Sequence, residues 1–412
     1  MASPTIDTYL AKHANYPALI TAPVAEDLEM IVVIPCYNEP NLETTLLSLS
    51  TCQIPNKSIE IIVVVNEAMS EKASITLKNK VSLTLIKRWQ LSENKFQTYS
   101  IYINEIPFKK AGVGYARKTG MDEAVRRFRN SNSEQQLIIC LDADTTVEPN
   151  YFTEIHSYFE AHPDCPAAAI NYAHPLDNTN PKVNLAILQY ELHLRYYEVG
   201  QRWAGLPYAQ QTVGSAMVVR ADAYVAQGGM NTRKAGEDFY FMHKFTHHHS
   251  FGNITATQVI PSARISDRVP FGTGRAMQSL IEGEESLTTY APQSFAAIKK
   301  LIDQLPILYD GDMVVKNSEP MSIFLRDHNF PKKVQEIRNN TTDFASFEKR
   351  FFVWFDAFRC MKFLHYSRDH HHPNISIATA ANWLNKIFFT AKNDLSELEL
   401  LIKFRVHSKS KK

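Results

Sequence analysis

The segment Leu137-Ile-Ile-Cys-Leu-Asp-Ala-Asp-Thr-Thr-Val-Glu-Pro149 decides the fold, because a short apolar run ends in two aspartates one residue apart. An unbroken apolar run is typical of a strand that is buried on both faces of a parallel sheet. Asp142 and Asp144 would lie at its carboxyl end, where open α/β sheets bind their ligands. Residues two apart in an extended chain point the same way, so both carboxylates could hold one Mg²⁺ or Mn²⁺. The alternative is a solvated turn capped by aspartates, and other segments must decide between the two.

The segments before and after this run alternate between strand and helix patterns. Apolar, β-branched runs at residues 30–35 and 59–67 predict two more buried strands, and the spacing of residues 42–49 predicts a helix between them. A glycine-rich loop that enters a helix is predicted at 112–128, a further helix at 151–161, further strands at 167–172 and 212–220, and a strand pair at 254–265. This alternation predicts a mostly parallel α/β sheet with right-handed crossovers. No Gly-x-Gly-x-x-Gly follows the first strand, which argues against a dinucleotide-binding domain.

The pattern changes along the chain in a way that suggests domain boundaries. Residues 70–110 are polar, with a helix predicted at 71–80 and two short strand-like pieces after it. Beyond residue 276 the period is mostly helical. We therefore expect an N-terminal segment at 1–29, an α/β domain at 30–275, and a helical extension with a basic tail at 276–412.

Composition narrows the classes of protein that the chain can belong to. The net charge of +1 over 412 residues gives no reason to expect a nucleic-acid partner. Five cysteines without a Cys-x-x-Cys pair indicate reduced core residues rather than a disulfide framework. No window reaches the roughly 18 apolar residues that a spanning helix needs, and the N-terminus lacks the features of a signal peptide. We expect a cytoplasmic protein with at most a peripheral contact of the basic tail at the inner membrane face.

Three other segments carry charged groups suited to a phosphate or a proton. Arg117 lies at the glycine-rich start of a predicted helix, a place that accepts anions, although the helix could simply be packed by its small residues. Glu237 and Asp238 begin another predicted helix, where the dipole favours acids for structural reasons alone. Arg268 and Arg275 flank a glycine-bearing loop that would suit a diphosphate.

The chain resembles a family-2 glycosyltransferase of the GT-A fold in four segments that follow one another in the family's order. These segments are Val32-Val-Ile-Pro-Cys-Tyr-Asn-Glu39, Gly114-Tyr-Ala-Arg-Lys-Thr-Gly120, Leu141-Asp-Ala-Asp144 and Gly236-Glu-Asp238. The resemblance covers residues 30–275. It implies a nucleotide-sugar donor, a divalent cation, and an acceptor that is a glycan, a lipid-linked molecule or a small molecule.

The resemblance also implies a role for each matching residue. Pro35, Tyr37 and Glu39 would border the nucleoside, Arg117 would approach the nucleotide, Asp142 would lie near the ribose, and Asp144 would hold the metal of the DXD motif. Asp238 would be the general base that takes the proton of the acceptor hydroxyl, with Glu237 beside it. The family implies inversion at the anomeric centre.

Departures from the family pattern leave some choices open. Asn66-Glu67-Ala68 stands where the family has an acidic turn that reads the base, so the nucleotide is not determined. The Gln-x-x-Arg-Trp element of processive members is missing after Asp238, which predicts transfer of a single sugar. The residues 247–249, His-His-His, could supply a metal ligand or form a polar helix end. A nucleotidyltransferase and a catalytically silent nucleotide-sugar-binding protein are the alternatives.

Overall fold

The computed structural model describes residues 5–92, 95–210, 213–246, 251–265, 273–283, 286–311 and 316–409. The chain divides into two compact units. The first comprises Met1–Pro175, Thr212–Arg275 and Lys409–Lys412, and the second comprises Leu176–Gln211 and Ala276–Ser408. Residues 176–211 thus group with the C-terminal helices, whereas the sequence analysis placed them in the domain of residues 30–275.

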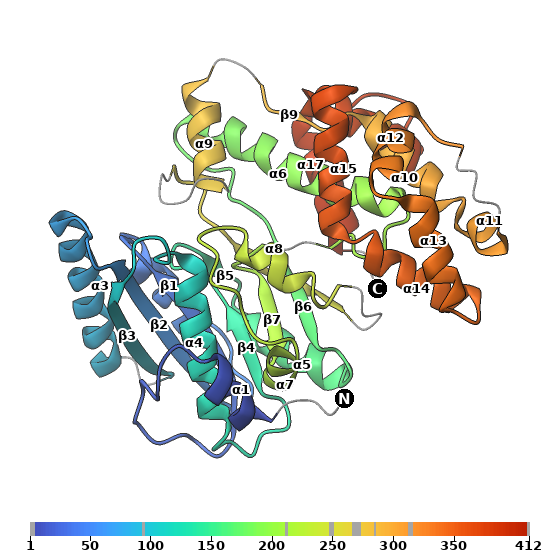
Figure 1. The fold of residues 1–412 in the computed structure, drawn as a ribbon. Coiled ribbons are helices and arrows are strands. Elements are labelled where there is room, and N and C mark those ends of the chain that lie inside the picture. Colours follow the sequence, from blue (N-terminus) through green and yellow to red (C-terminus); the bar gives the residue numbers. More distant parts are fainter. Residues whose placement is uncertain are drawn as a thin grey trace. The chain divides into compact units, whose positions relative to one another are not determined.

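The first unit is built around one eight-stranded sheet (Figure 1) with the strand order β3-β2-β1-β4-β7-β6-β8-β5. The strands are β1 (Leu28–Cys36), β2 (Ser58–Ala68), β3 (Gln97–Ile106), β4 (Leu137–Cys140), β5 (Thr146–Val147), β6 (Ala167–Tyr172), β7 (Met217–Arg220) and β8 (Gly252–Ile260). β1 pairs in parallel with β2 and β4, β2 with β3, and β6 with β8. β7 is antiparallel to both of its neighbours, and β5 is antiparallel to β8. The predicted class, an α/β fold with a mostly parallel sheet, is confirmed.

The strand directions bring one set of chain ends to a common edge of the sheet. β8 runs parallel to β6, and both run opposite to β7, which itself runs opposite to β4. The carboxyl ends of β1, β4 and β8 therefore lie at the same edge, together with the residues that precede β7. Parallel α/β sheets bind ligands at this edge.

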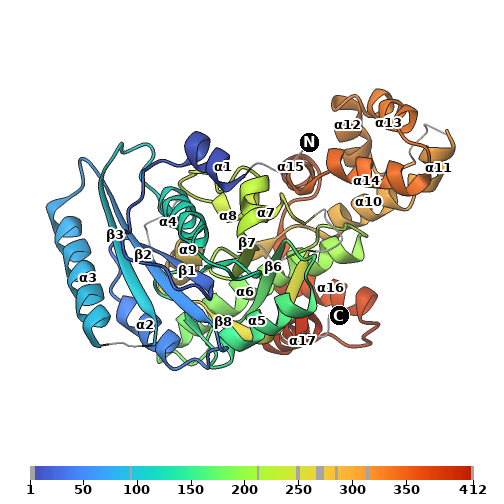
Figure 2. The same ribbon diagram turned by 90° about the horizontal axis from the view of Figure 1, so that it is seen from below.

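Helices of the first unit cover both faces of the sheet. Figure 2 shows α4 (Val113–Phe128), α1 (Ile6–His13), α7 (Ala221–Ala226) and α8 (Glu237–Met242) on one face, and α2 (Leu42–Ser50) and α5 (Tyr151–Ala161) on the other. α4 packs directly on the two central strands. A Cβ atom at Gly120 would lie 2.5 Å from Val33 Cγ1 and 2.9 Å from Val64 Cγ2. The glycine is needed for this close approach, as its position among small residues predicts.

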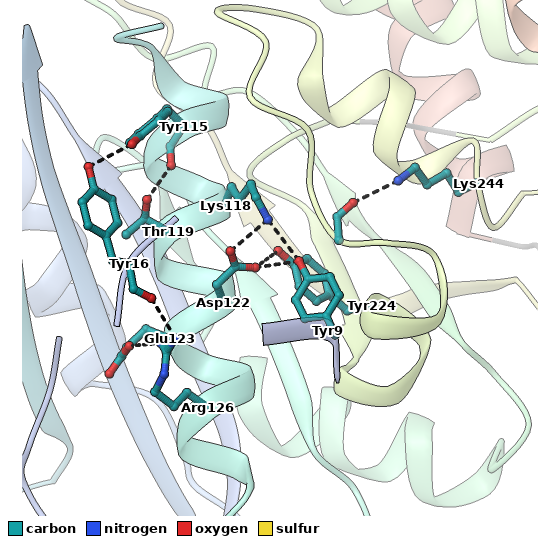
Figure 3. Close-up of polar contacts among 11 residues, drawn as sticks. Tyr9, Tyr16, Tyr115, Lys118, Thr119, Asp122, Glu123, Arg126, Tyr224 and Lys244 are labelled. Carbon is teal, nitrogen blue, oxygen red and sulfur yellow. Dashed lines mark hydrogen bonds and ion pairs between the residues drawn. The ribbon is translucent and has the colours of Figure 1, made fainter. Parts of the chain in front are cut away.

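The N-terminal segment is held against α4 by a buried polar network (Figure 3). The Asp122 carboxylate accepts hydrogen bonds from the hydroxyls of Tyr9 and Tyr224, each at 2.7 Å, and forms an ion pair with Lys118 at 2.9 Å. Glu123 accepts the backbone N–H groups of residues 19 and 20 at 3.2 and 2.9 Å. Lys118, Asp122 and Glu123 thus each have a hydrogen-bond or ion-pair partner within the fold.

Three predicted elements differ from the observed ones. The helix predicted at 71–80 is the longer α3 (Ala73–Ser92), because its buried positions include polar Asn79 and Ser82 and so leave no clear apolar stripe. The two strand-like pieces that follow form the single strand β3. The strand pair predicted at 254–265 is the single strand β8, since the chain leaves the sheet at Ile260, just before Pro261.

The second unit is almost entirely helical, as predicted for the C-terminal part of the chain. Its elements are α6 (Pro181–Trp203), α10 (Pro292–Ile302), α11 (Leu305–Asp310), α12 (Glu319–Asp327), α13 (Phe330–Asn339), α14 (Phe344–Trp354), α15 (Ala357–His370), α16 (Ile377–Phe388), α17 (Glu397–Lys409), and the strands β9 (Thr288–Thr289) and β10 (Ile375–Ser376). α9 (Thr273–Glu282) begins at the boundary between the units. All five cysteines are free and buried, and their burial agrees with the expectation of core residues. Within the described ranges, no helix combines the length and apolar character needed to cross a membrane.

Candidate functional site

Charged side chains from five segments meet at the carboxyl edge of the sheet in the first unit. Asp142 and Asp144 follow β4, Glu39 follows β1, and Arg264 follows β8. Arg117 comes from the beginning of α4, and Glu237 and Asp238 are the first two residues of α8. The structure therefore gathers acids that lie about 200 positions apart in the sequence.

Arg117 is at the centre of this cluster. Its Nη2 donates to Asp142 Oδ1 and its Nη1 donates to Glu237 Oε1. Arg117 and Glu237 are each only 2% exposed, whereas the Asp142 side chain is 37% exposed. Asp238 also acts electrostatically on Arg117, and together these carboxylates raise the pKa of the guanidinium against the opposing effect of burial. One guanidinium thus joins the aspartate after β4 to the acidic pair of α8.

Glycines make this arrangement possible. A Cβ atom at Gly214, just before β7, would lie 2.5 Å from Arg117 Nη1, so the guanidinium passes directly over this residue. A Cβ atom at Gly114, in the first turn of α4, would lie 2.3 Å from the carbonyl oxygen of Arg233. The second glycine lets the segment that leads into α8 approach the start of α4. A side chain at Gly214 would displace the guanidinium of Arg117, and one at Gly114 would displace the backbone of Arg233.

Asp238 is placed by backbone groups rather than by an arginine contact. Its carboxylate accepts the backbone N–H of Phe239 at 2.7 Å, and the backbone of Gly214 also donates a hydrogen bond that lowers its pKa. Gly236, in the left-handed region with φ of 70°, directly precedes the acidic pair and reverses the chain into α8. Asp238 as a residue is half-buried.

Arg264 forms the second bridge of the cluster. Its Nε donates to Asp144 Oδ2 at 2.9 Å, and its Nη2 donates to Glu39 Oε2. Glu39 also accepts the backbone N–H of Asn41 at 2.8 Å. Arg264 thereby ties the loop after β1 to the turn after β4, and it occupies the side of Asp144 that faces Glu39.

Burial and mutual repulsion raise the pKa of several carboxylates in the cluster. Burial, followed by the neighbouring charges of Asp142 and Glu39, raises the pKa of Asp144 to about 6. Burial is also the main cause of the raised pKa of Glu39, Glu237 and Asp238, and the charge of Asp142 adds to each shift. Arg117 and Arg264 oppose these shifts but do not cancel them. The site therefore holds more negative charge than its arginines neutralise.

This surplus of negative charge fits a hard divalent cation. Carboxylate oxygens are the ligands that Mg²⁺ and Mn²⁺ prefer, and Asp142 and Asp144 are the two carboxylates at the end of β4. Across the described ranges, no group of three or more His, Cys, Asp or Glu residues forms a candidate metal site by itself. Asp142 and Asp144 are thus the candidate ligands among the described residues, and water or phosphate oxygens would complete the coordination shell.

Asp142 and Asp144 do not lie on an extended strand, as the sequence analysis assumed. β4 ends at Cys140, and residues 143 and 144 lie in a turn. Asp142 is held by Arg117 and Asp144 by Arg264. Both carboxylates still act on each other electrostatically, since Asp142 raises the pKa of Asp144.

The other residues singled out in the sequence have varied surroundings. Pro35 lies near the end of β1, and the Tyr37 hydroxyl donates to Glu71 Oε2 at 2.9 Å, so both lie at the carboxyl edge of β1. Arg275 is exposed in the first turn of α9. Arg268 and residues 247–249 lie outside the described residues.

Glu67 is a buried acid at the end of β2, where the family resemblance expects an acidic turn. Its carboxylate accepts hydrogen bonds from Asn79 Nδ2 and the Tyr102 hydroxyl, both at 2.8 Å, and from Thr76 at 3.2 Å. Asn79 in turn accepts the backbone N–H of Asn38 at 2.9 Å. Glu67 thus braces the loops after β1 and β2.

The sequence analysis missed two residues of the site, Arg264 and Gly214. A signal for Arg264 existed, because it follows an apolar strand by four residues, as Asp142 and Asp144 follow theirs. Assigning residues 254–265 to a strand pair hid that signal. Gly214 lies among the small residues in front of β7. Its contact with Arg117 depends on the pairing of β7 with β4, which the sequence does not reveal.

The sequence matches no protein-family model and no curated protein sequence. Solved structures with a similar course of the chain include residues 1–349 of TarS from S. aureus in complex with UDP-GlcNAc, with a TM-score of 0.41 and 12% identity over 93% of this chain and 91% of that one. Another is the mannosyltransferase PcManGT from Pyrobaculum calidifontis in complex with GDP-Man and Mn²⁺, with a TM-score of 0.37 and 13% identity over 85% and 93% of the two chains. These values are too low to bear on what this chain does.

Proposed function

We propose that the protein is a family-2-like glycosyltransferase of the GT-A fold, which moves one sugar from a nucleotide-diphosphate sugar to an acceptor hydroxyl. The observation that carries the proposal is the bridge of Arg117 between Asp142 and the Glu237-Asp238 pair. It links the two motifs that such a transfer needs, one for the leaving diphosphate and one for the nucleophile. The order of the four motifs in the sequence supports the same conclusion.

Asp238 is the proposed general base. An acceptor hydroxyl must lose its proton as its oxygen bonds to the anomeric carbon, and a carboxylate within hydrogen-bond reach can accept that proton. Burial and the charge of Asp142 raise the pKa of Asp238, which makes its carboxylate a better proton acceptor than an ordinary aspartate. Attack from the side opposite to the diphosphate inverts the anomeric centre in a single displacement.

Asp142, Asp144 and the arginines serve the leaving diphosphate. A divalent cation on the two aspartates would neutralise the charge that develops on the departing diphosphate. Arg117 keeps Asp142 and Glu237 in place, and both of its terminal nitrogens donate to these carboxylates. Its proposed role is therefore to position the acids, rather than to bind the nucleotide as the sequence suggested.

Arg264 is the arginine better suited to the diphosphate. Its side chain is 23% exposed, and it contacts Asp144, the proposed metal-binding residue. When a cation binds Asp144, the guanidinium can turn from this carboxylate to a phosphate oxygen, since arginine binds both kinds of group with the same geometry. Arg268 and Arg275 remain proposed contacts of the diphosphate, and Pro35, Tyr37 and Glu39 remain proposed neighbours of the nucleoside.

A thermal-shift panel of UDP, GDP, CMP and dTDP sugars, with and without Mn²⁺ or Mg²⁺, tests the proposal, because ligands that bind only the native state raise its Tm. We expect one nucleotide sugar to raise Tm in a metal-dependent way, and Asp144→Ala to abolish this shift. Product analysis with that donor should then show a sugar transferred with release of the nucleoside diphosphate. A metal-dependent shift with nucleoside triphosphates alone would favour a nucleotidyltransferase. Binding without any turnover in wild-type protein would favour a silent binding protein.

A further inference from the structure

The outer face of α3 combines exposed apolar side chains with unpaired positive charge. Leu77, Val81 and Leu91 are 64%, 62% and 87% exposed, although apolar residues of a sheet-covering helix normally face the sheet. The positions that α3 does bury include Asn79 and Ser82. Part of the helix therefore has the reverse of the expected polarity.

These apolar residues form a stripe along the helix rather than scattered positions. Leu77, Val81, Arg88 and Leu91 are separated by four, seven and three residues, which places them on one face. At 1.5 Å per residue, the stripe from Leu77 to Leu91 is about 21 Å long. A flat surface could contact all of it at once.

Basic residues accompany the stripe. α3 carries Lys78, Lys80, Lys87 and Arg88, and it contains no aspartate or glutamate between Ala73 and Ser92. Within the described part of the chain, none of these four side chains forms an ion pair. This concentration contrasts with a net charge of only +1 for the whole chain.

The position of α3 leaves this face open. α3 packs on β2 and β3, and β3 is the edge strand of the sheet. Both views of the ribbon show α3 at the outer end of the first unit, with no described element on its far side (Figures 1 and 2). The face is therefore not covered by the part of the first unit that the structure describes.

We propose that the outer face of α3, formed by Leu77, Lys80, Val81, Lys87, Arg88 and Leu91, docks on a membrane surface that contains anionic lipids. A helix that lies in the plane of the headgroups buries its apolar stripe among the acyl chains, while its lysines and arginines contact the lipid phosphates. A nucleic acid would match the charges but would leave the leucines and the valine in water. The inference does not depend on the proposed transfer reaction, because it concerns a different surface and needs no substrate.

Flotation of the full-length protein with vesicles tests this inference. We expect wild-type protein to bind vesicles made of equal parts phosphatidylcholine and phosphatidylglycerol, and not to bind phosphatidylcholine alone. Lys80→Gln/Lys87→Gln/Arg88→Gln should weaken binding at least tenfold, and Leu77→Gln/Val81→Gln/Leu91→Gln should weaken it by a similar factor. Because all six residues are exposed, both variants should keep the Tm of the wild type.

A matched variant controls for charge. Lys332→Gln/Lys349→Gln/Arg350→Gln removes three exposed positive charges from the second unit and should leave vesicle binding unchanged. The inference is overturned if wild-type protein does not bind the anionic vesicles, or if the matched variant loses as much binding as the α3 charge variant. It is also overturned if the apolar variant binds like the wild type, since charge alone would then account for the binding and any polyanion would serve.

Discussion

The two parts of α4, residues 113–117 and residues 118–128, which we call its two ends, hold their buried charges in opposite ways. Beyond its first turns, acids and bases pair one to one: Lys118 with Asp122, Arg126 with Glu123, and Arg127 with Glu60. At its beginning, Arg117 alone faces the carboxylates of Asp142, Glu237 and Asp238 within the described residues. A balanced set of charges stabilises a fold, whereas a surplus costs stability and is kept where a ligand or a reaction uses it. We therefore propose that Arg117 belongs to the functional site, and that the ion pairs of residues 118–128 stabilise the fold.

Neutralising one carboxylate next to each end of α4 should give the largest difference in turnover. Asp238→Asn is expected to lower turnover roughly 10²–10⁴-fold, because the acceptor hydroxyl loses its proton acceptor. Donor binding in the thermal-shift assay should persist, since the metal-binding aspartates are unchanged. Steady-state kinetics with the donor found in the panel measures the effect.

Asp122→Asn is the matched change at the other end of α4. It should lower the free energy of unfolding, because Lys118 would be left buried without its partner, and it should leave turnover of the folded enzyme within a few-fold of wild type. Equal losses of turnover in both variants would mean that the two ends of α4 do not differ in the way proposed.

Replacing a basic residue at each end of α4 should show whether Mn²⁺ stabilises the two ends differently. Arg117→Met leaves three neighbouring carboxylates without a cation and should lower the free energy of unfolding by about 3–5 kcal/mol. Mn²⁺ should restore part of this loss, since it supplies the missing positive charge. Urea unfolding with EDTA and with Mn²⁺ measures both effects.

Lys118→Met provides the comparison for that experiment. It should also destabilise the protein, but Mn²⁺ should restore no more stability than it adds to the wild type, because Asp122 keeps the hydroxyls of Tyr9 and Tyr224 as donors. If Mn²⁺ stabilises both variants to the same extent, the surplus of negative charge near Arg117 does not bind metal.

The surplus of negative charge near Arg117 also predicts an unusual dependence of stability on pH. Burial and neighbouring acids raise the pKa of Glu237 and Asp238 in the folded protein. Above their ordinary pKa, the unfolded chain has released protons that the folded protein still holds, so a rise in pH favours unfolding. In EDTA, these groups should lower the free energy of unfolding by roughly 1–3 kcal/mol between pH 4.5 and pH 7. Urea unfolding at several pH values measures the slope.

Asp238→Asn should flatten this slope, because the amide does not titrate and the charge that raises the pKa of Glu237 is removed. Asp164→Asn, at an exposed position of the first unit, should keep the wild-type slope. An unchanged slope in Asp238→Asn would assign the pH dependence to other groups.

The sequence predicts the sheet and most acids of the site for a physical reason. Apolar β-branched runs followed by acids identify both the strands and the sheet edge at which side chains such as Asp142 and Asp144 gather. Local patterns suffice for this, since strand burial and strand ends are encoded within a few residues. The Glu237-Asp238 pair was found by its order after these motifs.

What the sequence does not reveal depends on contacts between distant segments. Arg117 was expected to approach the nucleotide, and its terminal nitrogens donate to Asp142 and Glu237, which lie 25 and 120 positions away. α3 was predicted at half its length, because some of its apolar residues face outward, polar residues occupy buried positions, and the helical period is obscured. Arg264 was overlooked since its strand was taken for two. In each case the pairing partner, rather than the local pattern, decides the role of the residue.

The smallest expected effect concerns Arg264, which holds the side of Asp144 that a cation would approach. Arg264→Met should increase the affinity for Mn²⁺ without donor up to about tenfold, or by about 1.4 kcal/mol, because Asp144 no longer has to leave an ion pair in order to bind the metal. Isothermal titration calorimetry with Mn²⁺ alone measures the change. The same variant should bind the donor more weakly once Mn²⁺ is saturating, since the diphosphate loses a guanidinium.

Arg264→Lys should bind Mn²⁺ with an affinity between those of the wild type and Arg264→Met. Its ammonium group keeps the positive charge but loses the second hydrogen bond, the one to Glu39. If Arg264→Met binds Mn²⁺ no more tightly than wild type, Arg264 does not compete with the cation, and the surplus charge that attracts the metal must be assigned to Asp142 and its partners on α4 and α8.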